Sequence, residues 1–179
     1  MESTTDTLVN LALSTTRATF VTNHQHLFLV GTEGLQKPEA PRRTVQLEKM
    51  ELDALSLSEP TAPSSKPPRP DWLVLPLKKM QDTFPAMITV GRTANNDIVL
   101  QDVTISKLHA FFQTTAGALE LCDAGSRNGT FVDGRRLAGR GKGEKVKLGD
   151  YVRFGQISLR ILDAGQTWDT VQKGLRGRL

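Results

Sequence analysis

Short apolar stretches separated by turn residues fill the second half of the chain, from about residue 72 to residue 162. Within several stretches apolar and polar residues alternate, which is the period of a strand buried on one face. No long amphipathic helical pattern interrupts them, so a succession of short strands predicts an all-β sandwich. The predicted strands are Trp72–Leu77, Met87–Gly91, Ile98–Leu100, Ala110–Thr114, Ala118–Cys122, Thr130–Val132, Arg135–Leu137, Lys145–Leu148, Tyr151–Phe154 and Ile157–Leu162.

Two dipeptides in this region carry turn signals, Asn128-Gly129 and Asp133-Gly134. Both central positions of a type I′ hairpin turn need a positive φ, which Asn, Asp and Gly adopt more readily than other residues. Both dipeptides are therefore predicted to be type I′ turns.

The pattern before residue 72 is weaker and predicts a small mixed or helical extension. Apolar residues recur on one face between Thr4 and Phe20, which predicts a short helix. The run Leu27–Val30 predicts a strand or a packed extended segment. Five prolines in residues 60–70 favour polyproline II and predict a semi-rigid linker. The predicted organisation is an N-terminal extension over residues 1–59, a Pro-rich linker over 60–70, the sandwich over 71–163 and a C-terminal tail over 164–179.

Composition narrows the class of protein. The 179 residues carry a net charge of +4, which suits anionic partners without choosing among them. The single cysteine excludes an internal disulfide and fits a reducing compartment. The longest apolar run, Leu27–Val30, is far short of the roughly 20 residues of a membrane-spanning helix. A soluble cytoplasmic protein without membrane contact is expected.

Three short motifs between the predicted strands carry the candidate chemistry: Gly91-Arg92, Ser106-Lys107-Leu108-His109 and Asn128-Gly129-Thr130. A guanidinium offers a planar fork of donors to a phosphate, and a hydroxyl or ammonium adds further donors. An asparagine amide offers both a donor and an acceptor to an extended peptide. Each motif alone also has an ordinary explanation as a strand end, a loop or a hairpin turn.

Taken together and in this order, the motifs resemble the forkhead-associated (FHA) domain family, in particular its bacterial members. Gly149-Asp150 and Gly155 follow them as the family pattern requires, and the resemblance covers about residues 72–162. It implies an FHA-like (SMAD/FHA) sandwich of about eleven short strands whose loops at one end bind a phosphothreonine peptide. The expected function is a phosphothreonine-binding adaptor in Ser/Thr kinase signalling.

The resemblance also implies roles for single residues. Arg92 and Ser106 are expected to hold the phosphate, with Lys107 and Arg127 assisting. Asn128 is expected to anchor the main chain of the peptide. The remaining roles are Thr104 as a reader of the third residue after the phosphothreonine, and Gly91, His109 and Gly129 as structural support of the site.

Two other functions stay open from the sequence. The first is an FHA domain that binds a protein partner without using phosphate, with the N-terminal extension as the partner surface. The second is nucleic-acid binding through the basic stretch 135–147, against which the lack of interleaved aromatic residues argues. No catalytic constellation is present, so no enzyme activity and no cofactor are expected. No metal site is expected at His24 and His26, which lack Cys or carboxylate neighbours. The expected partners are phosphothreonine-containing proteins, either Ser/Thr kinases or their substrates.

Thr4 and Thr5 are candidates for phosphorylation, because they are expected to lie in a mobile tail beside Asp6. Some small bacterial FHA proteins resemble this layout and carry phosphorylatable threonines in a tail that docks on their own FHA face. A phosphate here would compete for Arg92 and Ser106 at a high effective concentration. The alternative is that both are ordinary tail residues.

Overall fold

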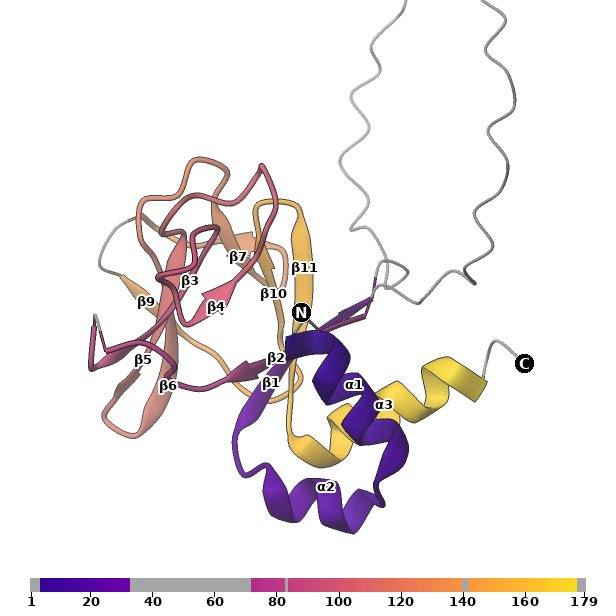
Figure 1. Ribbon diagram of the computed structural model, residues 1–179. Helices are drawn as coiled ribbons and strands as arrows, with labels where there is room; N and C mark the ends of the chain where they lie inside the picture. The colour runs from indigo at the N-terminus through magenta and orange to yellow at the C-terminus, as the bar shows by residue number, and fades with distance from the viewer. Residues whose placement is uncertain (1–3, 33–71, 83, 140–141, 177–179) are drawn as a thin grey trace, which may run out of the picture.

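The computed structural model describes residues 4–32, 72–82, 84–139 and 142–176. Within these residues two β-sheets pack face to face and three helices lie together beside them (Figure 1). One sheet has six strands in the order β2-β1-β11-β10-β7-β8, and the other has five in the order β4-β3-β5-β6-β9. The strands are β1 (Leu27–Thr32), β2 (Trp72–Leu77), β3 (Met87–Gly91), β4 (Ile98–Val99), β5 (Ala110–Thr115), β6 (Ala118–Asp123), β7 (Thr130–Val132), β8 (Arg135–Arg136), β9 (Gly143–Lys145), β10 (Tyr151–Phe154) and β11 (Ile157–Leu162).

The predicted all-β sandwich is confirmed, and the predicted strands form in their predicted order. Leu29, Phe112, Phe154 and Ile161 are fully buried between the two sheets and form the centre of the main core. The largest difference in bounds is at β9, which covers Gly143–Lys145 and shares only Lys145 with the predicted strand Lys145–Leu148. The chain turns there because the Asp150 carboxylate accepts a hydrogen bond from the Lys147 N–H at 3.0 Å.

One of the two predicted hairpin turns is correct. Asp133 and Gly134 both have a positive φ, of 46° and 80°, and join β7 to β8. The prediction for Asn128-Gly129 is wrong, since Gly129 has a φ of 84° but Asn128 is not among the residues with a positive φ. The reason is topological: β6 and β7 belong to different sheets, so this segment is a crossing loop between sheets. Such a loop places Asn128 at an end of the sandwich, where a ligand can reach it.

Strand β1 lies inside the sandwich, although its residues belong to the predicted extension. It pairs with β2 on one side and with β11 on the other. Leu29 faces the main core, whereas Phe28 and Val30 face the helices, so the strand is buried on both faces. This explains its unbroken apolar run, since complete burial of each such side chain stabilises the fold by about 1.5–3 kcal/mol. The division at residues 60–70 stays a prediction, because the linker lies outside the described residues.

The helices α1 (Thr4–Ser14), α2 (Arg17–Asn23) and α3 (Ala164–Arg176) cover the outer face of the six-stranded sheet at β1 and β2 (Figure 1). The helix predicted between Thr4 and Phe20 is broken at Thr16, whose hydroxyl caps α2 by accepting a hydrogen bond from the Thr19 N–H. Residues 164–176, predicted as part of a tail, instead form α3. Its Trp168 indole donates a hydrogen bond to the Thr15 carbonyl at 3.2 Å. Both ends of the chain therefore build one helical layer.

The position of Thr4 and Thr5 also differs from the prediction. Both lie in the first turn of α1, not in a mobile tail. The helix forms because Leu8 and Ala12, one turn apart, are buried in the apolar cluster beneath the three helices. Phosphorylation of either threonine remains a prediction.

Candidate functional site

Four loops meet at one end of the sandwich: residues 92–97, 100–109, 124–129 and the turn at 155–156. Hydrogen bonds between them fix their relative positions. The Arg92 N–H donates to the Ser106 carbonyl at 3.0 Å, and the Gly155 N–H donates to the Gly129 carbonyl at 3.1 Å. The crossing of the chain between sheets thus brings the three sequence motifs to one surface.

The glycine of the first motif permits a close approach between two of these loops. A Cβ atom on Gly91 would lie 2.2 Å from the Lys107 carbonyl oxygen, far inside any real contact. The same oxygen accepts hydrogen bonds from the Thr93 hydroxyl at 3.0 Å and from the Asn96 amide at 2.8 Å. Asn96 is buried, and its amide also donates to the Thr93 carbonyl at 2.8 Å. Asn96 is a supporting residue that sequence reasoning did not assign, since an asparagine in a loop has no specific pattern of its own.

Ser106 is half-buried and sits at the junction of the loops. Its Oγ accepts a hydrogen bond from the Arg127 N–H at 3.1 Å, so the hydroxyl proton is left for a ligand. Arg92, Lys107 and Arg127 lie in the loops that meet here, and their side chains are exposed. None of these three cations takes part in the ion pairs of the described residues. A hydroxyl donor among unpaired cations is an arrangement that binds an anion.

His109 is fully buried beneath this junction and connects two loops. The Ser106 N–H donates to Nδ1 at 3.1 Å, which makes Nδ1 an acceptor. Nε2 therefore carries the proton and donates to the Gly129 carbonyl at 3.1 Å. Burial lowers the pKa of His109, against the opposing influence of the Gly129 carbonyl and Asp123. The ring is thus held as one neutral tautomer, and its two nitrogens fix the Ser106 loop relative to the Gly129 loop.

Asp123 organises the crossing loop and was not singled out from the sequence. Its buried carboxylate accepts hydrogen bonds from the Gly125 and Ser126 N–H groups and from the Ser126 and Thr130 hydroxyls. Burial alone would raise the pKa of Asp123, but these hydrogen bonds outweigh burial and lower it. An aspartate two residues before a glycine is the local signal that could have revealed this loop.

Asn128 and Thr104 are brought together across two loops. The Asn128 amide nitrogen donates to the Thr104 carbonyl at 2.7 Å, which fixes the amide and leaves its oxygen free to accept from a ligand. The Thr104 hydroxyl donates to the Asp102 carboxylate and accepts from the Gln156 N–H. The proton of that hydroxyl is therefore engaged within the protein and is not available to a ligand.

The basic stretch 135–147 lies where an edge of one sheet meets an edge of the other. Arg135 and Arg136 lie on β8 at an edge of the six-stranded sheet, whereas Lys145 lies on β9 at an edge of the other sheet. Arg135 is also paired with Glu144. This ion pair joins the two edges and neutralises one positive charge of the stretch, which weakens the case for a nucleic-acid site there.

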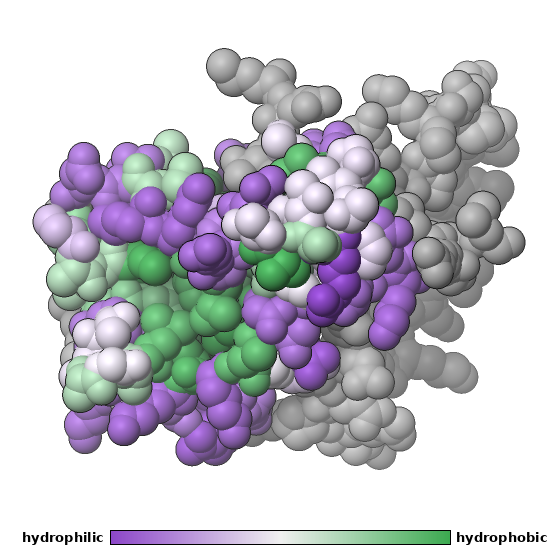
Figure 2. Space-filling view, turned by 90° about the horizontal axis from the view of Figure 1, so that it is seen from below, coloured by the Kyte–Doolittle hydropathy of each residue, from purple (hydrophilic) through white to green (hydrophobic). Residues whose placement is uncertain are grey.

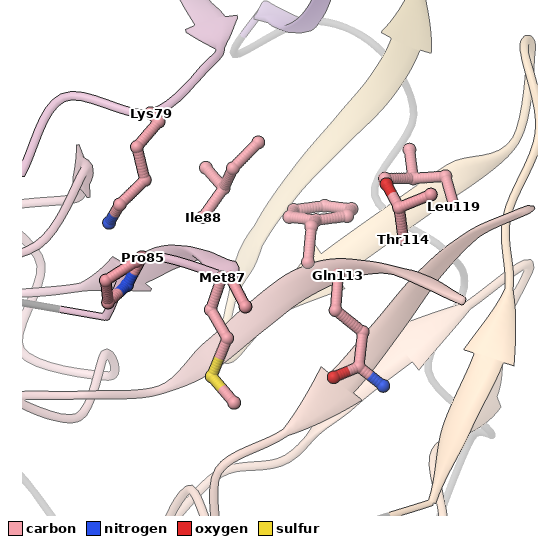
Figure 3. A pocket seen from close by; sticks show the side chains of 9 residues that line it. Lys79, Pro85, Met87, Ile88, Gln113, Thr114 and Leu119 are labelled. Atoms are coloured by element: carbon pink, nitrogen blue, oxygen red, sulfur yellow. The ribbon is translucent and has the colours of Figure 1, made fainter. Parts of the chain in front are cut away.

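A small pocket lies at the end of the sandwich opposite the four loops, where β3 begins and β5 ends (Figure 3). Figure 2 views the molecule from this lower side and shows apolar residues in a hollow bordered by polar ones. The pocket has a volume of about 90 Å³, too small for a typical ligand pocket of roughly 300 Å³ or more. Its labelled lining residues are Lys79, Pro85, Met87, Ile88, Gln113, Thr114 and Leu119.

In the described ranges, no cluster of three or more His, Cys, Asp or Glu side chains is placed to hold a metal ion. In the same part of the chain, no helix is long and apolar enough to cross a membrane.

Comparison with known proteins identifies relatives of this fold. The model of the FHA domain family matches residues 88–155. An oxoglutarate dehydrogenase inhibitor of Corynebacterium diphtheriae is 40% identical over 75 residues, which are 42% of this chain and 50% of the relative. The glycogen accumulation regulator GarA of Mycolicibacterium smegmatis is 37% identical over 82 residues, 46% of this chain and 49% of GarA. The chain therefore spans about half the length of these curated relatives.

Solved structures show similarity of the same kind. The FHA-2 domain of the Mycobacterium tuberculosis ABC transporter Rv1747 is 30% identical, with a TM-score of 0.39, over 65% of this chain and 93% of that domain. Mycobacterium tuberculosis EmbR in complex with a low-affinity phosphopeptide is 25% identical, with a TM-score of 0.43, over 51% of this chain and 22% of EmbR.

Proposed function

Because this chain is an FHA-domain protein, with the domain matched at residues 88–155, we propose that it is a phosphothreonine-binding adaptor in Ser/Thr kinase signalling. The observation that carries the proposal is the junction at Ser106. There a hydroxyl with a free proton lies among three exposed cations that have no carboxylate partner in the described residues. A phosphate group, with its charge near −2 and its three acceptor oxygens, matches this set of donors.

Each residue of the site has a role in this proposal. Arg92 binds two phosphate oxygens with its guanidinium fork, and Ser106 donates its hydroxyl to a third. Lys107 and Arg127 add positive charge beside the phosphate. Asn128 accepts a hydrogen bond from the peptide main chain, and the methyl group of Thr104 contacts a neighbouring peptide side chain. The supporting residues are Gly91, Asn96, His109, Asp123 and Gly129.

Rigidity of the loops supports recognition of one phosphorylated residue. The hydrogen bonds through His109, Asn96 and Asp123 hold the backbone of the site loops in place. Little ordering entropy is then lost on binding. The preference for phosphothreonine over phosphoserine is part of the proposal, since the threonine methyl group adds apolar contact.

The proposal assigns binding, not catalysis, to the chain. The relatives are an inhibitor and a regulator by name, and we infer that this chain likewise acts by contacting other proteins. Its proposed partners are phosphothreonine-containing proteins, either Ser/Thr kinases or their substrates, and its proposed compartment is the cytoplasm.

The test is the affinity of the intact protein for a phosphothreonine peptide library. Arg92→Ala is expected to weaken binding by about 2–5 kcal/mol, the range for removing one partner of a desolvated charge pair. The melting temperature should not change, because the Arg92 side chain is exposed. Lys173→Ala, which removes an exposed cation from α3, is the control and should bind like the parent.

Two control libraries separate the alternatives. Phosphoserine peptides should bind more weakly than phosphothreonine peptides, and unphosphorylated peptides should not bind measurably. Equal binding of the unphosphorylated library would favour a phosphate-independent interaction domain. An Arg92→Ala protein that binds like the parent would refute the assignment of this site.

A further inference from the structure

The part of the six-stranded sheet that the helices leave open carries arginines stacked on aromatic rings. The helices pack on β1, β2 and β11. Beyond them, the register places Arg136 and Arg153 on either side of Phe131, on the same outer face. In the next row of that face, Arg160 lies opposite Tyr151. We call these five residues the arginine strip.

The arginines of the strip stack on aromatic rings and donate to backbone carbonyls, but they form no ion pair among the described residues. The Arg153 guanidinium carbon lies 3.5 Å from the centre of the Phe131 ring, and that of Arg136 lies 6.0 Å from it. The Arg160 guanidinium lies 5.1 Å from the centre of the Tyr151 ring. The ion pairs among the described residues all involve other cations. The three guanidinium groups therefore have no ion-pair partner among the described residues, although the Asp133 carboxylate lies beside the strip, where it accepts a hydrogen bond from the Tyr151 N–H.

The strip begins at the candidate phosphopeptide site. A Cβ atom on Gly129 would lie 2.7 Å from the Arg136 Nε, so this guanidinium covers the Gly129 loop. The Arg153 guanidinium donates to the Gly155 carbonyl, and the Gly155 N–H donates to the Gly129 carbonyl. A peptide that leaves the site past Asn128 therefore meets Arg136 first.

We propose that the arginine strip binds an acidic segment that flanks the phosphothreonine of the partner, an inference that rests on the proposed function. Guanidinium forks pair with carboxylates in a bidentate manner, and their stacking on rings orients the forks before binding. The strip crosses from β8 to β11, three strand spacings or about 14 Å, which an extended peptide covers in about four to five residues. Arg153 covers one face of the Phe131 ring, which leaves less of the ring for stacking of a nucleic-acid base.

The experiment compares two phosphothreonine peptide libraries with the intact protein. In one library three adjacent residues within five positions of the phosphothreonine are Glu, and in the other they are Gln. Each library is made in two forms, with these residues on the N-terminal flank or on the C-terminal flank. Dissociation constants come from fluorescence anisotropy at 50 and 300 mM NaCl. We expect the Glu library to bind about 3- to 10-fold more tightly on one flank, the product of a few exposed ion pairs. The advantage should shrink at high salt, where such pairs are screened.

The test variant is Arg136→Gln/Arg160→Gln, which removes two exposed charges from the strip. It should lose the advantage of the Glu library and keep the affinity for the Gln library. The control Lys145→Gln/Lys173→Gln removes the same charge elsewhere and should keep both. Thermal melts of both variants verify that they fold. If the test variant folds and still binds the Glu library more tightly than the Gln library by the full factor, the acidic segment does not bind to the strip.

The remaining outcomes separate this inference from the proposed function. Equal affinities for the Glu and Gln libraries, with phosphate-dependent binding retained, would overturn the inference alone. Absence of binding to either library would overturn the proposed function and the inference with it. Binding of a 20-nucleotide oligothymidylate that is lost in the test variant, together with equal library affinities, would assign the strip to nucleic acid instead.

Discussion

Replacement of Gly91 by alanine tests whether the close contact between two loops builds the binding site. The new Cβ would lie 2.2 Å from the Lys107 carbonyl oxygen, and real Cβ contacts are essentially never shorter than 3.0 Å. One of the two loops must therefore move by nearly an ångström. The Lys107 carbonyl is backbone and is held by Thr93 and Asn96, so a side-chain rotation cannot relieve the clash.

The cost follows from these contacts. Displacement of the carbonyl weakens two hydrogen bonds, each with a net value of about 0.5–1.5 kcal/mol. Forcing an extra methyl group into a packed site costs about 1–3 kcal/mol. We therefore expect Gly91→Ala to lower the free energy of unfolding by about 2–6 kcal/mol. Because the displaced residue follows Ser106 directly, phosphopeptide affinity should fall as well.

Urea unfolding followed by circular dichroism measures the first effect, and peptide anisotropy measures the second. Gly139→Ala is the matched control, since no atom lies within 4 Å of its Cβ position and its φ is not positive. It should unfold at the midpoint of the parent and bind equally well. If Gly91→Ala also unfolded at that midpoint, with the same slope, the proposed loop contact would be refuted.

Two further predictions concern protonation and phosphorylation. Burial lowers the pKa of His109 in the folded protein from its ordinary 6.5. As the pH falls below 6.5, the unfolded chain therefore binds a proton at this residue more readily than the folded protein does. Stability is therefore full above this pH and falls as the pH drops below it, and an NMR titration should give His109 a midpoint below 6.5; a midpoint at or above that value would contradict the buried neutral tautomer. A phosphate on Thr4 or Thr5 is predicted to weaken binding of an external phosphopeptide by docking on the same face, which requires the first turn of α1 to unwind. Protein made with phosphothreonine at either position should then show chemical-shift changes at Arg92, Ser106 and Asn128, and unchanged shifts would leave both threonines as ordinary helix residues.

Local sequence patterns were enough to predict most of the strands and the motifs between them. Alternation of apolar and polar residues is a local property, so strands such as Met87–Gly91 and Tyr151–Phe154 were predicted with their observed bounds. The turn at Asp133-Gly134 was also predictable, since positive φ is a preference of single residues. The order of the three motifs indicated the family. No single motif shows how its residues come together with those of the other two.

Tertiary structure decided which of these local elements became neighbours. Asn128-Gly129 has the residues of a hairpin, yet the chain crosses there from one sheet to the other, which no local preference encodes. Asn96 and Asp123 support the site through partners in other segments of their loops, and their importance depends on burial that only packing creates. Strand β1 joined the sandwich, and α3 joined α1 and α2, because apolar faces far apart in the sequence can be removed from water only when they meet.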